Sequence, residues 1–430
     1  MRSVSVAVSF LIAAACSLPS FAAPLDASMA EVTPEWSGEV LAQVDQSYAG
    51  WDVEIGDADN DGRNEILTTG CPDSRLYCIK NTDGTWQSQI LAENLAQHTP
   101  GMGLAVRVVD INKDRKNEII LGTGQESAGT AFFYLFETDG QQITRQVFSR
   151  PDCNKSGYTH NFAVRDLDRD GVDEVISAYC GGGEIIRYDL DSALATISAR
   201  KIHQLSGSGE ESLIADVDND GKDEFITANG FRAGKARVEI FEFDDKGELL
   251  APPRIALDGV DGQGCFYASI QIGDLDHDGR NEMAVGWKHE QKVNKATLIV
   301  YRVEAGATPL YVLDRDTEDL DMAYFEKMMA IADADNDGKN ELIISTRGDN
   351  QSEFITSRHL GRVYRYSVSA GGTADKQLLV DFSESFAESS WLAVGDADND
   401  GKNEVILATG KGDRTKPGTA SVVMLKKRTP

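Results

Sequence analysis

The sequence predicts an all-β fold, a seven-bladed β-propeller of four-stranded antiparallel blades, and three observations support this prediction. First, one acidic loop recurs seven times, with copies that begin at Asp57, Asp110, Asp166, Asp216, Asp274, Asp333 and Asp396. Second, successive copies are 53, 56, 50, 58, 59 and 63 residues apart, which suits one four-stranded blade better than a βαβ unit. Third, short apolar runs flank the copies, and no segment has a convincing helical periodicity.

Each blade is expected to begin with a strand immediately before its loop and to continue with a second strand immediately after it. First strands are predicted at residues 53–55, 106–108 and 392–394, and second strands at 65–67 and 404–407. Third strands are predicted at 132–136, 238–243 and 298–301, and a weaker fourth strand at 377–380. Alternating β-forming residues in short runs are typical of such strands.

The last predicted blade has a third strand at 421–425 but no fourth strand after it. A strand predicted at 39–44 precedes the first blade and has no blade of its own. We therefore expect this strand to complete the last blade and close the ring, since closure removes exposed sheet edges. The predicted organisation is a signal peptide at 1–22, a disordered leader at 23–36 and a single propeller domain at 37–430.

The first residues are typical of an export signal. A basic residue near the start is followed by an apolar run at 4–15 and by small residues at 20–22. We expect cleavage after Ala22 and a secreted or periplasmic protein. Residues 13–16 also resemble an imperfect lipoprotein box, so lipid anchoring is the alternative. The rest of the chain has no apolar stretch that could span a bilayer. We also expect the protein to be a monomer.

Each acidic loop carries the side chains of a calcium site. In the first copy Asp57, Asp59 and Asp61 alternate along the chain, Gly62 supplies a turn, and Glu65 is the ninth residue. Hard oxygen ligands without sulfur or imidazole suit calcium better than zinc. An EF-hand would place its glutamate at the twelfth position between two helices, so we reject it. Ordinary hairpin turns are the alternative, but seven copies with the same acidic positions favour Ca²⁺.

We assign as ligands the side chains at the first, third, fifth and ninth positions of each loop, and the backbone carbonyl at the seventh position. The predicted ligands are Asp57, Asp59, Asp61, Arg63 and Glu65; Asp110, Asn112, Asp114 and Glu118; Asp166, Asp168, Asp170, Val172 and Glu174; Asp216, Asp218, Asp220, Lys222 and Glu224; Asp274, Asp276, Asp278, Arg280 and Glu282; Asp333, Asp335, Asp337, Lys339 and Glu341; Asp396, Asp398, Asp400, Lys402 and Glu404. Up to seven ions are expected.

The second loop departs from this pattern at two positions. Asn112 replaces a carboxylate, and Arg115 stands where the other loops have glycine. A residue with a Cβ atom is disfavoured in a turn that requires a positive φ angle. We therefore expect the second site to be weak or empty.

The net charge follows from the loops. The chain has 70 acidic and 42 basic residues, and 27 of the carboxylates occupy the predicted ligand positions of the seven loops. The acidity is therefore largely a property of the predicted metal sites. A nucleic-acid-binding protein would show a basic stripe, so nucleic acid is not an expected partner.

Five cysteines follow the predicted signal peptide. Cys71 and Cys78 are at the two ends of a short loop, and Cys153 and Cys180 are in loops predicted to be neighbours. Each pair could form a disulfide in an oxidising compartment, which would leave Cys265 over. The alternative is that all five are reduced thiols.

The loops resemble those of FG-GAP/VCBS repeats, which occur in the ligand-binding head of integrin α chains and in secreted microbial proteins. Six of the seven carry the pattern Asp-x-Asp-x-Asp-Gly-x-x-Glu intact, over nearly the whole chain. The resemblance implies a propeller in which calcium loops join the first and second strands of each blade at the bottom rim. It does not imply one function, because this scaffold has many.

The resemblance also nominates the opposite, top face as the ligand-binding face. Aromatic platforms interleaved with polar groups suit sugar rings or an extended polymer. The candidates are Trp51, His98, Tyr158, His160, Tyr267, Trp287, His289 and Trp391. The alternative is that the aromatic residues wedge between adjacent blades.

Three functions are compatible with this sequence. The favoured one is a binding or adhesion module for a carbohydrate or for an extracellular or envelope protein. The second is a polysaccharide lyase that acts by β-elimination on a uronate polymer, with Tyr158, His160 and Arg347 as candidates for the base, the acid and the cationic group. The third is an assembly part of the envelope that has no small ligand.

Overall fold

The computed structural model describes most of the chain after the predicted signal peptide. The described residues are 23–24, 30–44, 52–70, 75–93, 95, 102–125, 132–138, 143–149, 157–180, 182–209, 211–230, 236–261, 264–265, 267–290, 293–317, 328–346, 361–369, 371–382, 389–410 and 420–428. The signal peptide predicted at 1–22 lies outside this set. No helix within the described ranges is long and apolar enough to cross a membrane.

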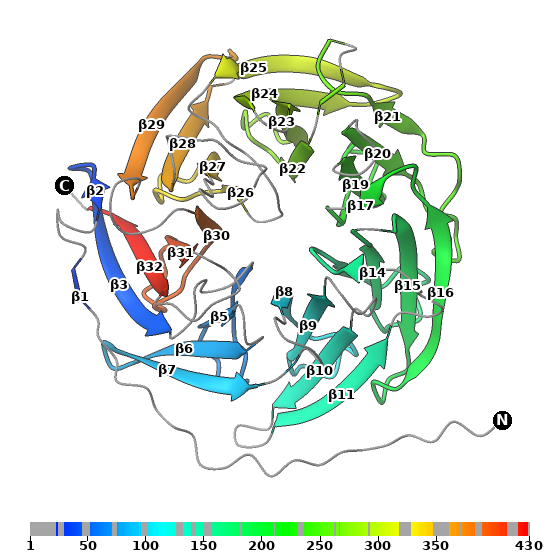
Figure 1. Cartoon of the computed structure of the whole chain (residues 1–430), viewed down its shortest axis with the longest axis horizontal. Coiled ribbons are helices and arrows are strands. Elements are labelled where there is room, and N and C mark those ends of the chain that lie inside the picture. Colours follow the sequence, from blue (N-terminus) through cyan, green and yellow to red (C-terminus); the bar gives the residue numbers. More distant parts are fainter. Residues whose placement is uncertain are drawn as a thin grey trace.

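Seven antiparallel sheets form a closed ring, as predicted (Figure 1). Blade 1 comprises β4 (Val53–Gly56), β5 (Glu65–Thr69), β6 (Leu76–Thr82) and β7 (Thr85–Ala92). Blade 2 comprises β8 (Met102–Val109), β9 (Glu118–Gln125), β10 (Phe132–Thr138) and β11 (Ile143–Ser149), with β12 (Gly157–Tyr158) beside β9. Blade 3 comprises β13 (Ala163–Arg165), β14 (Glu174–Ala178), β15 (Glu184–Leu190) and β16 (Thr196–Gln204).

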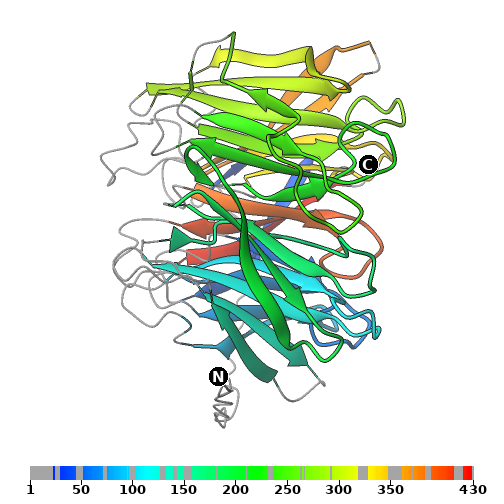
Figure 2. The ribbon, with the colours of Figure 1, turned by 90° about the vertical axis from the view of Figure 1, so that its right-hand side faces the viewer.

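Blades 4 to 6 repeat this order. Blade 4 comprises β18 (Leu213–Ala215), β19 (Glu224–Gly230), β20 (Arg237–Phe241) and β21 (Ile255–Leu257), with β17 (Ser208–Gly209) on β19. Blade 5 comprises β22 (Tyr267–Gly273), β23 (Glu282–Glu290), β24 (Val293–Val303) and β25 (Ala307–Thr317). Blade 6 comprises β26 (Met329–Ala332), β27 (Glu341–Ser345), β28 (Arg362–Val368) and β29 (Ala374–Asp381). The strands run across the thickness of the ring, so the connecting loops lie at its two faces (Figure 2).

Blade 7 confirms the predicted closure. It contains β30 (Ser389–Gly395), β31 (Glu404–Gly410) and β32 (Ala420–Lys427), and its fourth strand is β3 (Trp36–Val44) from the other end of the chain. The pairing runs antiparallel from Trp36 opposite Lys427 to Val44 opposite Ala420. Figure 1 shows the blue β3 beside the red β32.

The disordered leader predicted at 23–36 is wrong for the described part of that segment. β1 (Ala23–Pro24) pairs with β3, and β2 (Glu31–Val32) pairs with β29 of blade 6. Thr33 N–H donates a 3.1 Å hydrogen bond to Leu379 O, and the Trp36 side chain is fully buried. Pairing with open strand edges and burial of an indole therefore hold this segment against the last two blades.

The hydrophobic core lies between the blades. One cluster contains Leu41 of β3, Ile66 of β5 and Val422 of β32, so it joins blade 7 to blade 1. Every residue of β5 and of β31 is buried, because the second strand of a blade has neighbouring blades against both faces. Each blade depends on its neighbours for burial, as expected for repeat architectures.

The cysteine prediction is also corrected. Cys78 is a buried free thiol in the cluster that contains Leu67 and Leu76, so it does not form the predicted disulfide with Cys71, which lies outside the described residues. Cys180 is a buried thiol whose Sγ accepts a hydrogen bond of 3.2 Å from Ser208 Oγ, and its predicted partner Cys153 is also outside the description. Burial raises the pKa of the Cys78 thiol to about 12, which makes it unreactive.

Candidate metal centre

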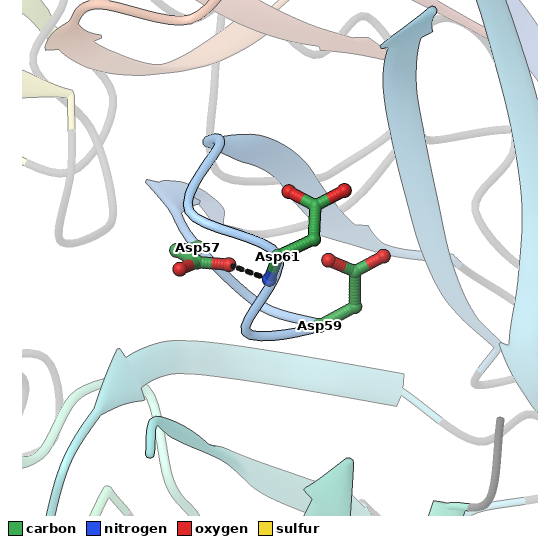
Figure 3. Close-up of side chains that lie close together, drawn as sticks. All are labelled: Asp57, Asp59 and Asp61. Carbon is green, nitrogen blue, oxygen red and sulfur yellow. Dashed lines mark hydrogen bonds between the residues drawn. The ribbon is translucent and has the colours of Figure 1, made fainter. Parts of the chain in front are cut away.

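Each acidic loop joins the first and second strands of its blade, as predicted from the sequence. In the first loop, Asp57 accepts a hydrogen bond from Asp61 N–H at 2.9 Å (Figure 3). It accepts a second from Gly62 N–H at 3.0 Å. Glu65 Oε2 accepts one from Ala58 N–H at 2.9 Å. This glutamate bond recurs in all seven loops at 2.8–3.1 Å. The loop conformation is therefore common to the seven blades.

The carboxylates of these loops converge. In the first loop, oxygens of Asp57, Asp59 and Asp61 lie within 4.8 Å of one another, and the carboxylates of Asp59 and Asp61 are side by side in Figure 3. In four other loops the converging oxygens belong to the first, third and ninth positions: Asp166, Asp168 and Glu174; Asp216, Asp218 and Glu224; Asp274, Asp276 and Glu282; Asp333, Asp335 and Glu341. The predicted backbone ligands at the seventh position donate N–H to the fifth-position carboxylate, at 2.9 Å for Arg63 and 2.8 Å for Lys222. The assignment of their backbone carbonyls as metal ligands stays a prediction.

Unsatisfied oxygens test whether these residues fit calcium. The Oδ1 atoms at the third position of four loops are buried and accept no hydrogen bond within the described structure: Asp59, Asp168, Asp335 and Asp398. A buried carboxylate oxygen without a donor is costly unless a cation satisfies it. An all-oxygen donor set of several carboxylates is also what Ca²⁺ prefers. The residues present therefore fit calcium.

Burial perturbs the glutamate that closes each loop. It raises the pKa of Glu118, Glu174, Glu224, Glu341 and Glu404 from 4.5 to about 7, because desolvation disfavours the charged carboxylate. Burial also raises the pKa of Glu65 and Glu282. A divalent cation at the loop would favour the carboxylate form of the same groups.

These shifts predict a pH dependence. Without calcium, a glutamate pKa raised from 4.5 to about 7 adds stability that is fully present below pH 4.5 and is lost as the pH rises through about 7. Calcium binds the deprotonated form, so its stabilising effect should increase over the same range. We expect the difference in Tm between calcium and chelator to be larger near pH 8 than near pH 5, measured by differential scanning calorimetry. A difference that does not change with pH would contradict this linkage.

The second loop adopts the same turn as the others. Arg115 has a φ angle of 75°, close to the 86° of Gly62, and its N–H donates to Asp110 Oδ2 at 2.8 Å. The strain of a non-glycine residue in this region is about 1–2 kcal/mol. Arg115 therefore adopts the turn at the strain that the sequence predicts, and the metal occupancy of this loop stays a prediction.

Sequence reasoning missed a set of clasps that link the loops of adjacent blades. Asn60 stands fourth in its loop with a φ angle of 60°, and its Oδ1 accepts a 2.6 Å hydrogen bond from Asn117 N–H in the next loop. Asn117 Nδ2 in turn donates to Asp57 O at 2.9 Å. The same exchange joins Asn399 to Asn64 and closes the ring. The sequence contains a signal for these links, because asparagine recurs at the fourth and eighth positions of the loops.

Replacement of Asn60 tests the clasp. Asn60→Ala removes its hydrogen bonds and places a Cβ residue without a polar side chain at φ 60°, so we expect a loss of about 1–3 kcal/mol in the free energy of unfolding. Asn60→Gly removes the hydrogen bonds but tolerates the φ angle, so its loss should be smaller. Urea denaturation of both variants separates the contribution of the hydrogen bonds from that of the strained φ angle. Two variants as stable as the wild type would show that the clasp contributes nothing.

The predicted ligand-binding face is wrong for its three described aromatic residues. Trp287 and Trp391 are 0% exposed and Tyr267 is 3% exposed, so they pack in the core, as the wedge alternative proposed. Trp287 Nε1 donates to Tyr301 OH at 3.3 Å within a cluster that joins blades 4 and 5. Aromatic rings this deeply buried offer no platform to a sugar.

The remaining candidates give this face no support. His160 is 5% exposed, and His289 is half-buried with Nε2 at 2.7 Å from Thr297 Oγ1. Trp51, His98 and Arg347 lie outside the described residues, as does the side chain of Tyr158. A cavity of about 270 Å³ between β8, β13 and β18 is lined by Arg107, Phe162 and Ser212 among others, and its described lining includes no candidate.

Seven closed blades, each with an acidic loop between its first two strands, make this protein a repeat propeller. Comparisons with known proteins find similar repeats. Residues 216–285 match the FG-GAP-like repeat family. The chain is 24% identical over 188 residues to integrin alpha-5 of Xenopus laevis, which covers 40% of this chain and 18% of that protein. It thus spans less than a fifth of that relative's length. Residues 216–285 therefore resemble an FG-GAP-like repeat, within a ring of seven blades that carry similar acidic loops.

Two solved structures are similar over most of their length. The V. cholerae biofilm matrix protein Bap1 matches with 10% identity and a TM-score of 0.44, over 94% of this chain and 91% of that chain. The Dos1 propeller matches with 10% identity and a TM-score of 0.46, over 91% of each chain.

Proposed function

We propose that this protein is a calcium-binding β-propeller that acts outside the cytoplasm as a binding or adhesion module. The observation that carries the proposal is the set of acidic loops. Carboxylates of these loops converge in several blades, and they include buried oxygens without a hydrogen-bond donor. Ligands held this way suit Ca²⁺, which would fix the loops and neutralise their charge. The export signal expected at 1–22 accords with a compartment rich in calcium.

A protein partner is favoured over a carbohydrate. The aromatic side chains proposed as sugar platforms, Tyr267, Trp287 and Trp391, are buried in the core. One relative with matching sequence is an integrin α chain, although this chain spans only part of it. We therefore propose that exposed loops of the ring contact an extracellular or envelope protein. A lyase has no supporting geometry, because His160 is the one member of its proposed triad whose side chain is described, and that side chain is buried.

The test is calcium-dependent binding to cell surfaces. Labelled protein is applied in calcium and in chelator to intact cells, to protease-treated cells and to immobilised polysaccharides, and bound calcium is counted by mass spectrometry. Binding that needs calcium and is lost after protease treatment supports a protein partner. Binding that survives protease and saturates on a polysaccharide supports a carbohydrate. Absence of both binding and bound calcium would overturn the proposal, and release of unsaturated uronate absorbance would indicate a lyase.

A further inference from the structure

A lysine occupies the carboxylate group of the first loop. Lys80 extends from β6, and its Nζ lies 2.6 Å from Asp59 Oδ2, 2.5 Å from Asp61 Oδ2 and 3.3 Å from Glu65 Oε1. These are three of the four side chains predicted to bind the ion. The Lys80 side chain is 26% exposed, so it covers the mouth of the loop and is not part of the core.

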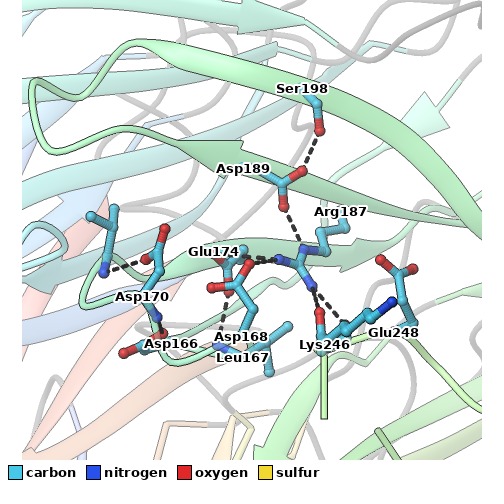
Figure 4. A network of polar contacts seen from close by, with 12 residues as sticks. Asp166, Leu167, Asp168, Asp170, Glu174, Arg187, Asp189, Ser198, Lys246 and Glu248 are labelled. Atoms are coloured by element: carbon cyan, nitrogen blue, oxygen red, sulfur yellow. Dashed lines mark hydrogen bonds and ion pairs between the residues drawn. The ribbon is translucent and has the colours of Figure 1, made fainter. Parts of the chain in front are cut away.

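Five other loops have a basic residue in the same role. In blade 3, Arg187 from β15 contacts Asp168 at 2.7 Å and Glu174 at 3.5 Å (Figure 4). The corresponding pairs are Arg254 with Asp218; Arg302 with Asp278 and Glu282; Arg365 with Asp335; and Lys426 with Asp398, Asp400 and Glu404. We call these six side chains the tethered cations. Most extend from the third strand, which lies beside the strand that carries the loop glutamate.

In blade 2, an acidic residue stands at the position of the tethered cation. Glu137 of β10 is directly opposite Glu118 of β9 in the sheet, where blade 1 has Lys80 beside Glu65. Among the side chains that the structure describes, no lysine or arginine forms an ion pair with Asp110, Asp114 or Glu118. Blade 2 thus has an acidic residue beside Glu118, and its loop has Asn112 in place of a carboxylate.

We propose that the tethered cations compete with calcium for the six loops, and that the second loop, which has Glu137 instead, depends on calcium most. A tethered cation neutralises the carboxylates without the ion, so it keeps a calcium-free loop formed. It must also withdraw from the same oxygens, or remain as a like charge beside the metal, when calcium binds. The second loop has no such competitor within the described structure. This inference rests on the proposed function and reverses the expectation that the second site is the weakest.

Two charge changes test the proposal with calcium chloride as the probe. Lys80→Met keeps a long side chain but removes the charge, so it should tighten calcium binding at one site by about tenfold, which is about 1.4 kcal/mol, and lower the Tm in chelator. Glu137→Lys should weaken one site by about tenfold and raise the Tm in chelator. Isothermal titration calorimetry and thermal melts provide the two measurements. Lys201→Met is the control, because Lys201 is exposed on β16 and bonds Gln204.

The outcomes separate this inference from the proposed function. Opposite shifts in affinity and in chelator Tm for Lys80→Met and Glu137→Lys support the competition. Calcium binding in every variant with wild-type affinity would overturn the competition and leave the calcium-binding function intact. No calcium binding in the wild type or any variant would overturn both. Should Lys80→Met fail to fold, the Glu137→Lys comparison decides alone.

Discussion

Trp36→Ala is expected to lower the free energy of unfolding by about 3–5 kcal/mol, the usual cost of truncating a buried tryptophan. The Trp36 side chain is 0% exposed at the start of β3 and packs with Val380 of β29 and Leu425 of β32. Its loss would leave a cavity between blades 6 and 7, beside the β3–β32 pairing that closes the ring. Urea denaturation followed by circular dichroism measures the change.

The control for this variant is on the same strand. Gln43 of β3 is exposed, so Gln43→Ala should change the free energy of unfolding by less than about 0.5 kcal/mol. The Trp36→Ala change leaves both partners of the 2.9 Å backbone hydrogen bond from Arg428 N–H to Glu35 O in place. If Trp36→Ala were as stable as Gln43→Ala, the closure by β3 would contribute little to the stability of the ring.

The blade order and the closure were predictable because they follow from local chemistry. An Asp-Gly turn between apolar runs specifies two paired strands, and a strand without a blade at one end must pair with a blade that lacks one at the other. β3 and β32 confirm this reasoning. The two-residue strands β1 and β2 were missed, because a pair of residues has no periodicity and is defined only by the edge that it joins.

The side chains that could not be predicted are those whose role depends on a neighbouring blade or strand. Trp287 and Trp391 have the same sequence context whether they face a ligand or wedge between blades, and only packing distinguishes the two. Asn60 reads as an ordinary turn residue until Asn117 of the next blade is placed beside it. Lys80 likewise reads as a solvated strand residue, although it contacts three carboxylates of a loop. In each of these cases the role of the side chain is set by tertiary contacts, which the local sequence does not specify.

Removal of calcium is expected to have the largest effect on this protein. A site that binds only the folded state contributes about 2.7 kcal/mol when free calcium is 100 times its Kd, so a few occupied loops contribute as much as the whole stability of an ordinary domain, about 5–15 kcal/mol. We expect chelator to lower the Tm strongly and calcium to restore it. Calorimetry with and without chelator, together with the calcium content by mass spectrometry, measures both effects.

Single-loop variants connect this loss to particular residues. Asp216 accepts hydrogen bonds from Asp220 and Gly221 N–H at 3.0 Å, so Asp216→Ala removes a ligand and loosens its loop, and it should lower the calcium content by about one ion per chain. Asp110→Ala should do the same, because the second loop has the same bonds. Asp375→Asn, which changes an exposed carboxylate of β29, should leave the calcium content unchanged. Equal calcium content in all three variants, or a chelator effect that persists when no calcium is bound, would show that the loops are ordinary acidic turns, because their carboxylates would then have no metal to hold.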